Sequence, residues 1–220
     1  MITISKSTLS FLKEIKLNNN REWFQSNQVA YKEAKTNFET FIQEVIKGII
    51  EFDPIVKGLE AKNCIFRINR DIRFSHDKSP YKSNFGAFIV RGGKKNGDKF
   101  AGYYLHIEPG ACFIAGGAYM PPSPWLSAIR EKIDQQPEQF KKIIGNKEFI
   151  HHFKEIEGGK LKNPPKGFAS DNPNIELLKH KSYLVMQKVS DKQLSAPDYY
   201  PHVIQVLKAM KPLNDFLNDW

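Results

Sequence analysis

The residues with the clearest chemical potential lie in one short segment, residues 66–82, which reads FRINRDIRFSHDKSPYK. The chain has six arginines, and three of them, Arg67, Arg70 and Arg73, fall within seven residues of this segment. A guanidinium group is a planar fork that binds carboxylate or phosphate through two parallel hydrogen bonds, and it stays charged when buried. With Lys82 close behind, these arginines predict a site for an anionic small molecule that carries phosphate or carboxylate.

Acidic side chains in the same segment add a catalytic alternative. Asp71 and Asp77 could orient the arginines, act as a general base, or hold a Mg²⁺ ion that bridges to a phosphate. Lys78 could stabilise the negative charge that develops in the reaction. With these three as candidate catalytic residues, the chain would be a metal-assisted phosphoester hydrolase, provided that both carboxylates converge on one accessible point. The sequence leaves open whether the chain is an enzyme and which cofactor, if any, it uses.

A structural ion-pair network is the competing interpretation of this segment. Arg70 with Asp71, and Arg73 with Asp77, could satisfy each other and hold the loop against a sheet. Neither a straight strand nor a helix gathers all three guanidinium groups on one side, because alternate residues of a strand face opposite ways. A shared site therefore requires a turn or bulge between about Arg70 and Ser75.

The composition fits a globular protein with an anionic partner. The chain has 220 residues, 40% of them hydrophobic and 26% charged, which is enough to bury a sizeable core. A net charge of +9 and a pI near 9.4 favour an anionic ligand and keep a nucleic-acid-binding module as an alternative function. Most of the basic residues are lysines scattered along the whole chain, as on an ordinary solvated surface.

The sequence predicts a cytoplasmic protein with no membrane segment. No apolar run approaches the roughly 20 residues that cross a bilayer, and the N-terminal residues lack the apolar core of a signal peptide. Cys64 and Cys112 lie far apart, each in an apolar segment and without CxxC spacing. We expect both to be reduced thiols in the core.

The N-terminal part of the chain predicts helices. Residues 8–18 have the spacing of a short amphipathic helix, and the motif NNREWF begins a second one with Asn19 as N-cap and Glu22 three residues later. Between residues 27 and 52, apolar side chains recur at helical spacing. This pattern predicts one long amphipathic helix that ends at Asp53-Pro54.

The middle of the chain predicts strands, and the C-terminal part returns to helices. Short aromatic and β-branched runs separated by glycine-containing loops predict antiparallel strands at residues 64–68, 84–91, 100–107 and 111–117. Helices are predicted at residues 124–135 (with Ser123 as N-cap), 137–144, 146–153 and 173–179, and in a tail at 198–219 interrupted at Pro212. An irregular loop at 157–174 and a strand at 182–189 complete this part.

Strands clustered between helical ends predict an α+β fold. We expect a central antiparallel meander flanked by N-terminal and C-terminal helices, forming a single domain over residues 1–220. No GxGxxG or GxxxxGK[ST] phosphate loop, HExxH motif or GxSxG elbow occurs in the sequence. The sequence motifs of Rossmann and P-loop nucleotide sites, HExxH metalloproteases and α/β-hydrolases are thus missing.

The string R-x-x-R-D-x-R-F-x-x-x-D-K-x-x-Y, from Arg67 to Tyr81, resembles the signature of the microbial family called domain of unknown function 2461. The segments NNREWF, HIEP, GGAYMPP, LKNPPKGF and DNPNIELLKHKSY are similar to other parts of that family. The resemblance spans nearly the whole chain and implies the family's fold, but it implies no activity. It marks as the family's defining element Arg67, Arg70, Asp71, Arg73, Phe74, Asp77, Lys78 and Tyr81.

The resemblance also adds distant residues to the candidate site. It implies Tyr81 and His106 as further ligand-binding residues beside Arg67, Arg70, Arg73 and Lys82. Other landmarks that could line the same cleft are Trp23, Trp125, the turn Gly116-Gly117, Lys166 and Lys181. The simpler interpretation makes the two tryptophans core or rim aromatics and GGAYMPP a tight turn whose glycines allow positive φ.

Overall fold

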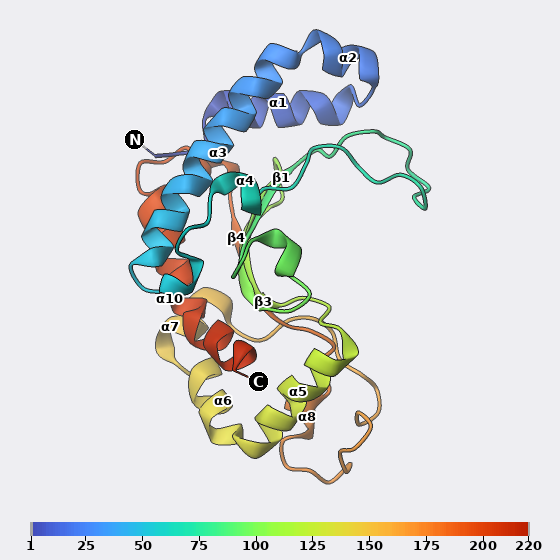
Figure 1. Cartoon of the computed structure of the whole chain (residues 1–220), viewed down its shortest axis with the longest axis vertical. Helices are drawn as coiled ribbons and strands as arrows, with labels where there is room; N and C mark the ends of the chain where they lie inside the picture. The colour runs from blue at the N-terminus through green and yellow to red at the C-terminus, as the bar shows by residue number, and fades with distance from the viewer. Residues whose placement is uncertain (1, 220) are drawn as a thin grey trace.

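The structure, a computed structural model, describes residues 2–219 and centres on a four-stranded antiparallel sheet (Figure 1). The strands follow one another across the sheet in chain order, as in a meander. They are β1 (Phe85–Ile89), β2 (Gly102–Ile107), β3 (Cys112–Ala118) and β4 (Tyr183–Val189). With helices before and after this sheet, the predicted α+β class is confirmed.

Helices occupy both ends of the chain and the long connection between β3 and β4. The N-terminal helices are α1 (Lys6–Leu17), α2 (Arg21–Ser26), α3 (Gln28–Ile50), the 3₁₀ turn η1 (Pro54–Val56) and α4 (Ala61–Cys64). The 3₁₀ turn η2 (Lys94–Asn96) lies between β1 and β2. The later helices are α5 (Ser123–Gln135), α6 (Pro137–Ile144), α7 (Lys147–Phe153), α8 (Ile175–Leu178), α9 (Asp191–Leu194) and α10 (Tyr199–Asn218).

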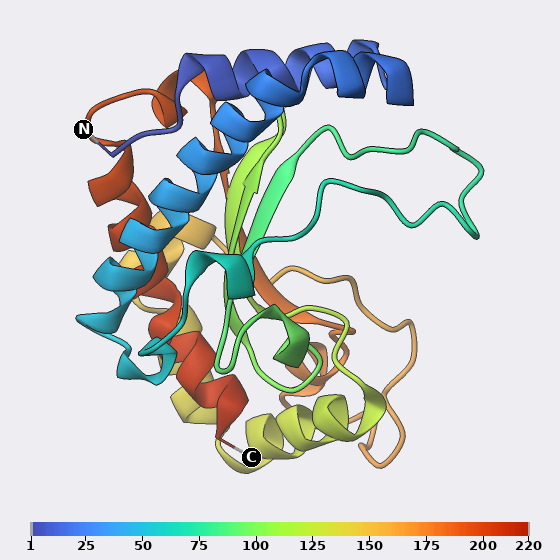
Figure 2. The same cartoon turned by 45° about the horizontal axis from the view of Figure 1, so that its top comes forward.

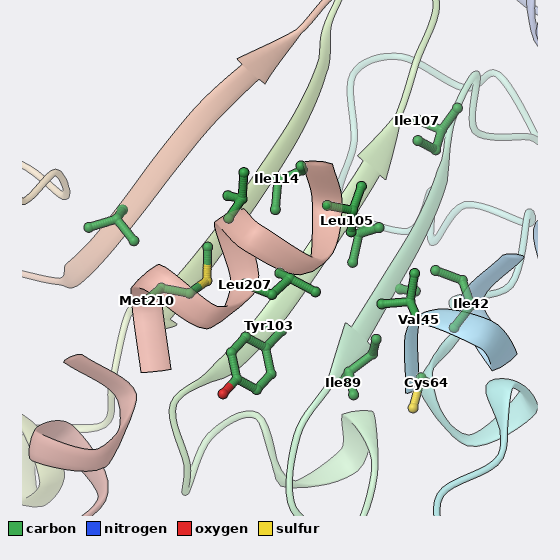
Figure 3. Close-up of a cluster of buried hydrophobic side chains, with 14 of the residues drawn as sticks. Ile42, Val45, Cys64, Ile89, Tyr103, Leu105, Ile107, Ile114, Leu207 and Met210 are labelled. Carbon is green, nitrogen blue, oxygen red and sulfur yellow. The ribbon is translucent and has the colours of Figure 1, made fainter. Parts of the chain in front are cut away.

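One face of the sheet is covered by α3 and α10, as Figure 2 shows. Alternate strand residues point toward these helices, so that Tyr103, Leu105 and Ile107 of β2 all belong to the buried core. Figure 3 shows side chains from the sheet, α3 and α10 meeting there, with Leu207 and Met210 among those labelled. This packing also explains why Pro212 does not interrupt α10: buried neighbours on both sides outweigh the lost backbone hydrogen bond.

Among residues 2–219, no α-helix covers the other face of the sheet, and only the short 3₁₀ turn η2 lies beside it, with Gly97 next to the Phe88 ring (Figure 2). The register places His106 of β2 between Gly86 of β1 and Phe113 of β3. Tyr104 lies in the same way between Phe88 and Ala115. The open face is therefore an aromatic surface crossed by a few glycine and alanine positions.

The strand predicted at residues 64–68 is not formed. Cys64 is the last residue of α4, whose start is fixed by a capping box between Glu60 and Asn63, and the chain beyond it makes only isolated bridges. These bridges pair Ile65 with Ala87 and Asn69 with Tyr81. A short apolar run does not reveal by its period that a helical turn will take its first residue.

Two predicted helix caps also shift by one residue. Asn20 caps α2 by accepting a hydrogen bond from the Trp23 amide at 2.9 Å, because the Asn19 side chain is engaged elsewhere. The N-cap position of α5 is Pro122, and Ser123 is the first helical residue. Both helices are present as predicted, and a difference of one residue at the cap lies within the usual uncertainty of a helix boundary.

Two smaller predictions concern the cysteines and the membrane. Cys64 and Cys112 are free and buried, as expected of reduced core thiols. Between residues 2 and 219, no helix combines the length and apolar character that spanning a bilayer requires.

Candidate functional site

A cleft of about 1060 Å³ lies over the open face of the sheet, and we call it the sheet-face cleft. Its floor is formed by side chains of the open face, among them Tyr104, His106 and Phe113. Basic residues lie along its walls, namely Arg70, Lys82, Lys94 and Lys95. A mostly apolar concave surface with a few convergent polar groups is the usual form of a small-molecule site.

The segment between residues 69 and 81 leaves the sheet as a long excursion that begins and ends at one bridge, and we call it the arginine loop (Figure 2). Arg70 pairs with Asp77 and donates a hydrogen bond to the Ser75 hydroxyl at 3.3 Å. Arg73 donates two hydrogen bonds to Asp71, at 2.9 and 2.6 Å. The pairing differs from the one that the sequence suggested, because each arginine reaches across a turn.

The other charged groups of the arginine loop also bind within it. The Lys78 ammonium donates to the Ile72 carbonyl oxygen at 3.1 Å. Hydrogen bonds from Ser79 and from Arg70 hold the pKa of Asp77 far below its ordinary value. The Arg73 hydrogen bonds likewise lower the pKa of Asp71. The three candidate catalytic residues are therefore engaged in contacts that hold the loop's shape.

The two carboxylates lie in separate ion pairs. Asp71 lines the sheet-face cleft, whereas Asp77 is absent from its walls and bonds to Ser79 and Arg70. Within the part of the chain that the structure describes, no group of three or more His, Cys, Asp or Glu side chains is arranged to hold a metal ion.

Arg67 and Lys82 differ from the other basic residues of the segment. Among residues 2–219, neither side chain has a carboxylate within the 4.0 Å of an ion pair or makes a side-chain hydrogen bond. They lie close enough that burial, together with the charge of Arg67, lowers the pKa of Lys82. Lys82 lines the cleft and its ammonium lies 5.5 Å from the centre of the Phe66 ring.

Tyr81 lies in the core and not in the cleft. Its ring stacks on Phe24 with ring centres 4.0 Å apart. The Asn19 side chain pairs with its backbone, donating to the Tyr81 carbonyl at 2.9 Å and accepting from the Tyr81 amide at 3.0 Å. The NNREWF motif therefore contacts the end of the arginine loop, and Tyr81 anchors that loop to the helices.

His106 lies in the cleft floor at the centre of a hydrogen-bond chain. Its Nδ1 lies 3.0 Å from the Tyr104 hydroxyl, and its Nε2 lies 3.2 Å from a Glu108 carboxylate oxygen. Ser83 donates to the other Glu108 oxygen at 3.0 Å. The imidazole also stacks on Phe113, with ring centres 4.5 Å apart and planes within 11°. The chain fixes both the position and the rotation of the imidazole ring.

Burial and hydrogen bonds shift the pKa values of Tyr104 and Glu108, the two partners of His106, in opposite directions. Burial raises the pKa of the Tyr104 hydroxyl to about 12, with a further contribution from the Glu108 charge. Burial would also raise the pKa of Glu108, but hydrogen bonds from His106 and Ser83 outweigh it and leave that pKa below its ordinary value. The chain thus joins a neutral phenol to an ionised carboxylate through one imidazole.

The remaining landmarks divide between cleft and core. Gly116 and Gly117 line the cleft, but they belong to β3 and not to a turn; Gly117 has φ +105°, where a side chain would meet the Tyr183 backbone. Trp125 is buried and donates to the Leu217 carbonyl at 3.1 Å. Trp23 packs against the core. The cleft lining does not include Trp23, Trp125, Lys166 or Lys181. It also lacks the predicted ligand-binding residues Arg67 and Arg73, which are exposed.

Several residues of this region are not predicted from the sequence as site residues. They are Phe88, Tyr104 and Phe113 of the cleft lining, and Glu108, which contacts His106 from outside that lining. The available signal was strand parity, because Phe88, Tyr104 and Phe113 all alternate with buried core residues. Lys94 and Lys95 lie in the predicted hairpin loop, where position alone gave no indication of a site.

Comparison with known proteins identifies the family but no characterised relative. No curated protein and no solved structure matches the chain. The family model DUF2461, described as a conserved hypothetical protein, matches residues 7–216. That match covers the helical ends, the sheet, the arginine loop and the sheet-face cleft. The chain therefore belongs to the DUF2461 family of conserved hypothetical proteins.

Proposed function

We propose that this protein binds a phosphate- or carboxylate-bearing small molecule in the sheet-face cleft. The observation that carries the proposal is Lys82, a half-buried lysine in the cleft wall with no carboxylate partner among the described residues and with Arg67 close by. Burial and the nearby Arg67 charge both disfavour the charged form of Lys82 and lower its pKa. A bound anion would offset both effects.

The neighbouring ion pairs support this role by contrast. Arg70 and Arg73 are neutralised by Asp77 and Asp71, so these pairs give the arginine loop a defined shape. Among residues 2–219, Arg67 and Lys82 form no ion pair, although the Arg67 charge contributes to the lowered pKa of Asp71. A site whose cations are unpaired can give its full charge to a ligand, and a bidentate guanidinium suits phosphate and carboxylate equally.

Calorimetric titration with inorganic phosphate and with succinate tests the proposal on the whole chain. We expect saturable binding of at least one of them that weakens with salt. Lys82→Met should weaken it about 10-fold or more, because a hydrogen bond to a charged group contributes about 1.5–3 kcal/mol. Lys32→Met, which removes an exposed lysine of α3, is the matched control and should leave the affinity unchanged.

Arg67→Met provides a second, independent test. It should weaken anion binding and also raise the pKa of Lys82, because it removes the nearby positive charge. Equal affinities of the wild type, Lys82→Met and Arg67→Met would overturn the proposal, as would the absence of saturable binding to both anions. We assign this function to the cytosol, where the two free, buried cysteines would stay reduced.

A further inference from the structure

We infer that the ligand of the sheet-face cleft is a nucleoside monophosphate, with its phosphate at Lys82, its base on the aromatic surface and a ribose hydroxyl at Tyr104. This inference rests on the proposed function and gives the anion a chemical class. Three features of the cleft carry it: the aromatic surface, the direction of the hydrogen-bond chain, and the closeness of the Lys82 ammonium to the aromatic rings.

The aromatic surface is the first feature. Phe66, Phe88, Tyr104 and Phe113 all line the cleft, and Tyr104 contacts the other three with ring centres 5.7 to 6.5 Å apart. Phe66 is 37% exposed although it is a large apolar side chain. Aromatic rings that face a basic groove are the usual platform on which bases stack.

The hydrogen-bond chain is the second feature, and its direction can be assigned. The ionised Glu108 carboxylate can only accept, so the His106 Nε2 nitrogen donates to it and carries the proton. The Nδ1 nitrogen then accepts from the Tyr104 hydroxyl. The remaining lone pairs of the Tyr104 oxygen can accept a hydrogen bond from a ligand, and a ribose hydroxyl is such a donor.

Gly86 shows that the fold leaves space for the Tyr104 hydroxyl. A Cβ atom at position 86 would lie 2.7 Å from the Tyr104 hydroxyl oxygen. Gly86 is paired with His106 in the register, and the Tyr104 ring crosses over it toward the imidazole. Any side chain at this position would push the hydroxyl away from Nδ1.

The closeness of these groups is the third feature. The Lys82 ammonium lies 5.5 Å from the Phe66 ring centre, and the Phe66 ring centre lies 6.4 Å from that of Tyr104. A cation, an aromatic face and a hydrogen-bond acceptor thus lie next to one another in the cleft. A nucleoside monophosphate carries the three complementary groups, namely a phosphate, a base and a ribose hydroxyl, and the cleft volume of about 1060 Å³ is sufficient to hold it.

Calorimetric titration of the whole chain with AMP, GMP, CMP and UMP tests the inference, with ribose 5-phosphate and inorganic phosphate as the partial ligands. We expect at least one nucleotide to bind about 10-fold or more tightly than ribose 5-phosphate, because only the nucleotide has a base to stack. Phe66→Leu should remove most of that advantage, and it should weaken inorganic phosphate binding much less than nucleotide binding, because Lys82 is retained. Phe74→Leu is the matched control, since Phe74 is 95% exposed and lies outside the cleft.

The ribose contact has its own test. Wild type should bind the preferred nucleotide more tightly than its 2′,3′-dideoxy analogue, by about 5-fold or more, because the analogue lacks the donor for Tyr104. Tyr104→Phe should bind the two with equal affinity. Gly86→Ala should reduce the same discrimination, because it displaces the hydroxyl without removing it.

The outcomes separate this inference from the proposed function. Phosphate binding that depends on Lys82, with no nucleotide binding more tightly than ribose 5-phosphate, would overturn the nucleotide and leave the anion site in place. If the wild type bound none of these ligands, both the nucleotide inference and the proposed anion site would be overturned. A single-stranded oligonucleotide that binds more tightly than every mononucleotide would also overturn the inference, in favour of a nucleic-acid surface.

Discussion

Tyr103 and Tyr104 are adjacent residues of β2, and they show how differently the two faces of the sheet are finished. The Tyr103 hydroxyl donates to Asp53 at 2.7 Å inside the core, under α3 and α10. The Tyr104 hydroxyl lies 3.0 Å from His106 in the floor of an open cleft. The same side chain therefore completes a buried pair on one face and begins a polar chain on the other.

This difference shows which face of the sheet has side chains available to bind a ligand. On the covered face, the side chains interdigitate with two long helices, and the Tyr103–Asp53 pair is satisfied there. On the open face, aromatic rings, an imidazole and basic side chains, among them Lys82, surround the cleft. Substitutions on the covered face should therefore change stability, and those on the open face should change binding.

Removing a large side chain from each face gives the largest expected contrast. Leu105→Ala on the covered face should lower the free energy of unfolding by about 2–5 kcal/mol, because Leu105 is fully buried and leaves a cavity. Met186→Ala on the open face should lower it by about 1 kcal/mol or less, because the cleft already exposes that side chain. Denaturant unfolding measures both, and equal losses would contradict the assigned faces.

Adding a methyl group to each face gives the next contrast. At Gly116 a Cβ would press on the Met210 sulfur and lie 2.7 Å from the Gly102 carbonyl oxygen, so Gly116→Ala should destabilise the fold by about 1–3 kcal/mol. At Gly86 it would meet the Tyr104 hydroxyl, the movable end of a side chain, so Gly86→Ala should cost less than about 1 kcal/mol. The same unfolding measurements decide, and a larger loss for Gly86→Ala would refute this ranking.

Deleting one tyrosine hydroxyl on each face should also lower the free energy of unfolding by different amounts. Tyr103→Phe should lower the free energy of unfolding by about 1–3 kcal/mol, because it leaves a buried Asp53 oxygen without its donor. Tyr104→Phe should lower it by less than about 1 kcal/mol, because water in the cleft can donate to His106 instead. Thermal unfolding at neutral pH compares the two variants, which differ from each other by one position in the chain.

The smallest expected effect is a titration. The difference in tyrosinate absorbance between the wild type and Tyr104→Phe should show one group with a pKa of about 12, since burial disfavours the charged phenolate. Because this folded-state pKa lies above the ordinary value of 10.0, the contribution of Tyr104 to stability is complete below pH 10 and is lost as pH rises toward 12. A midpoint near 10 would show that Tyr104 is solvated and not held against His106.

The order of elements could be predicted from the sequence more fully than the site. Helical spacing between residues 27 and 52 predicted α3, and alternation in residues 100–107 predicted β2, because both patterns belong to neighbouring residues. The strand predicted at residues 64–68 does not form, because Cys64 is the last residue of the capped helical turn α4. A short apolar segment can form either a strand or a helical turn, and its contacts with neighbouring segments decide which one forms.

The arginine loop shows why the candidate site was harder to predict. Its two arginines and two aspartates allow four pairings, and the observed pairs are Arg70 with Asp77 and Arg73 with Asp71. Which cations remained unpaired depended on how the loop bends. Tyr81 was expected to bind ligand, yet its ring stacks on Phe24 and its backbone is held by Asn19, 62 residues earlier in the chain.

By itself, the sequence determined the α+β order of helices and strands and the opposite orientation of Tyr103 and Tyr104, because backbone geometry fixes the period of side chains along a strand. Only the tertiary structure decided that Arg67 and Lys82 form no ion pair among the described residues, and that His106 links Tyr104 to Glu108 while Gly86 leaves space for the Tyr104 hydroxyl. Those arrangements depend on which segments meet in space, and contacts between distant segments follow from the packing of the whole chain.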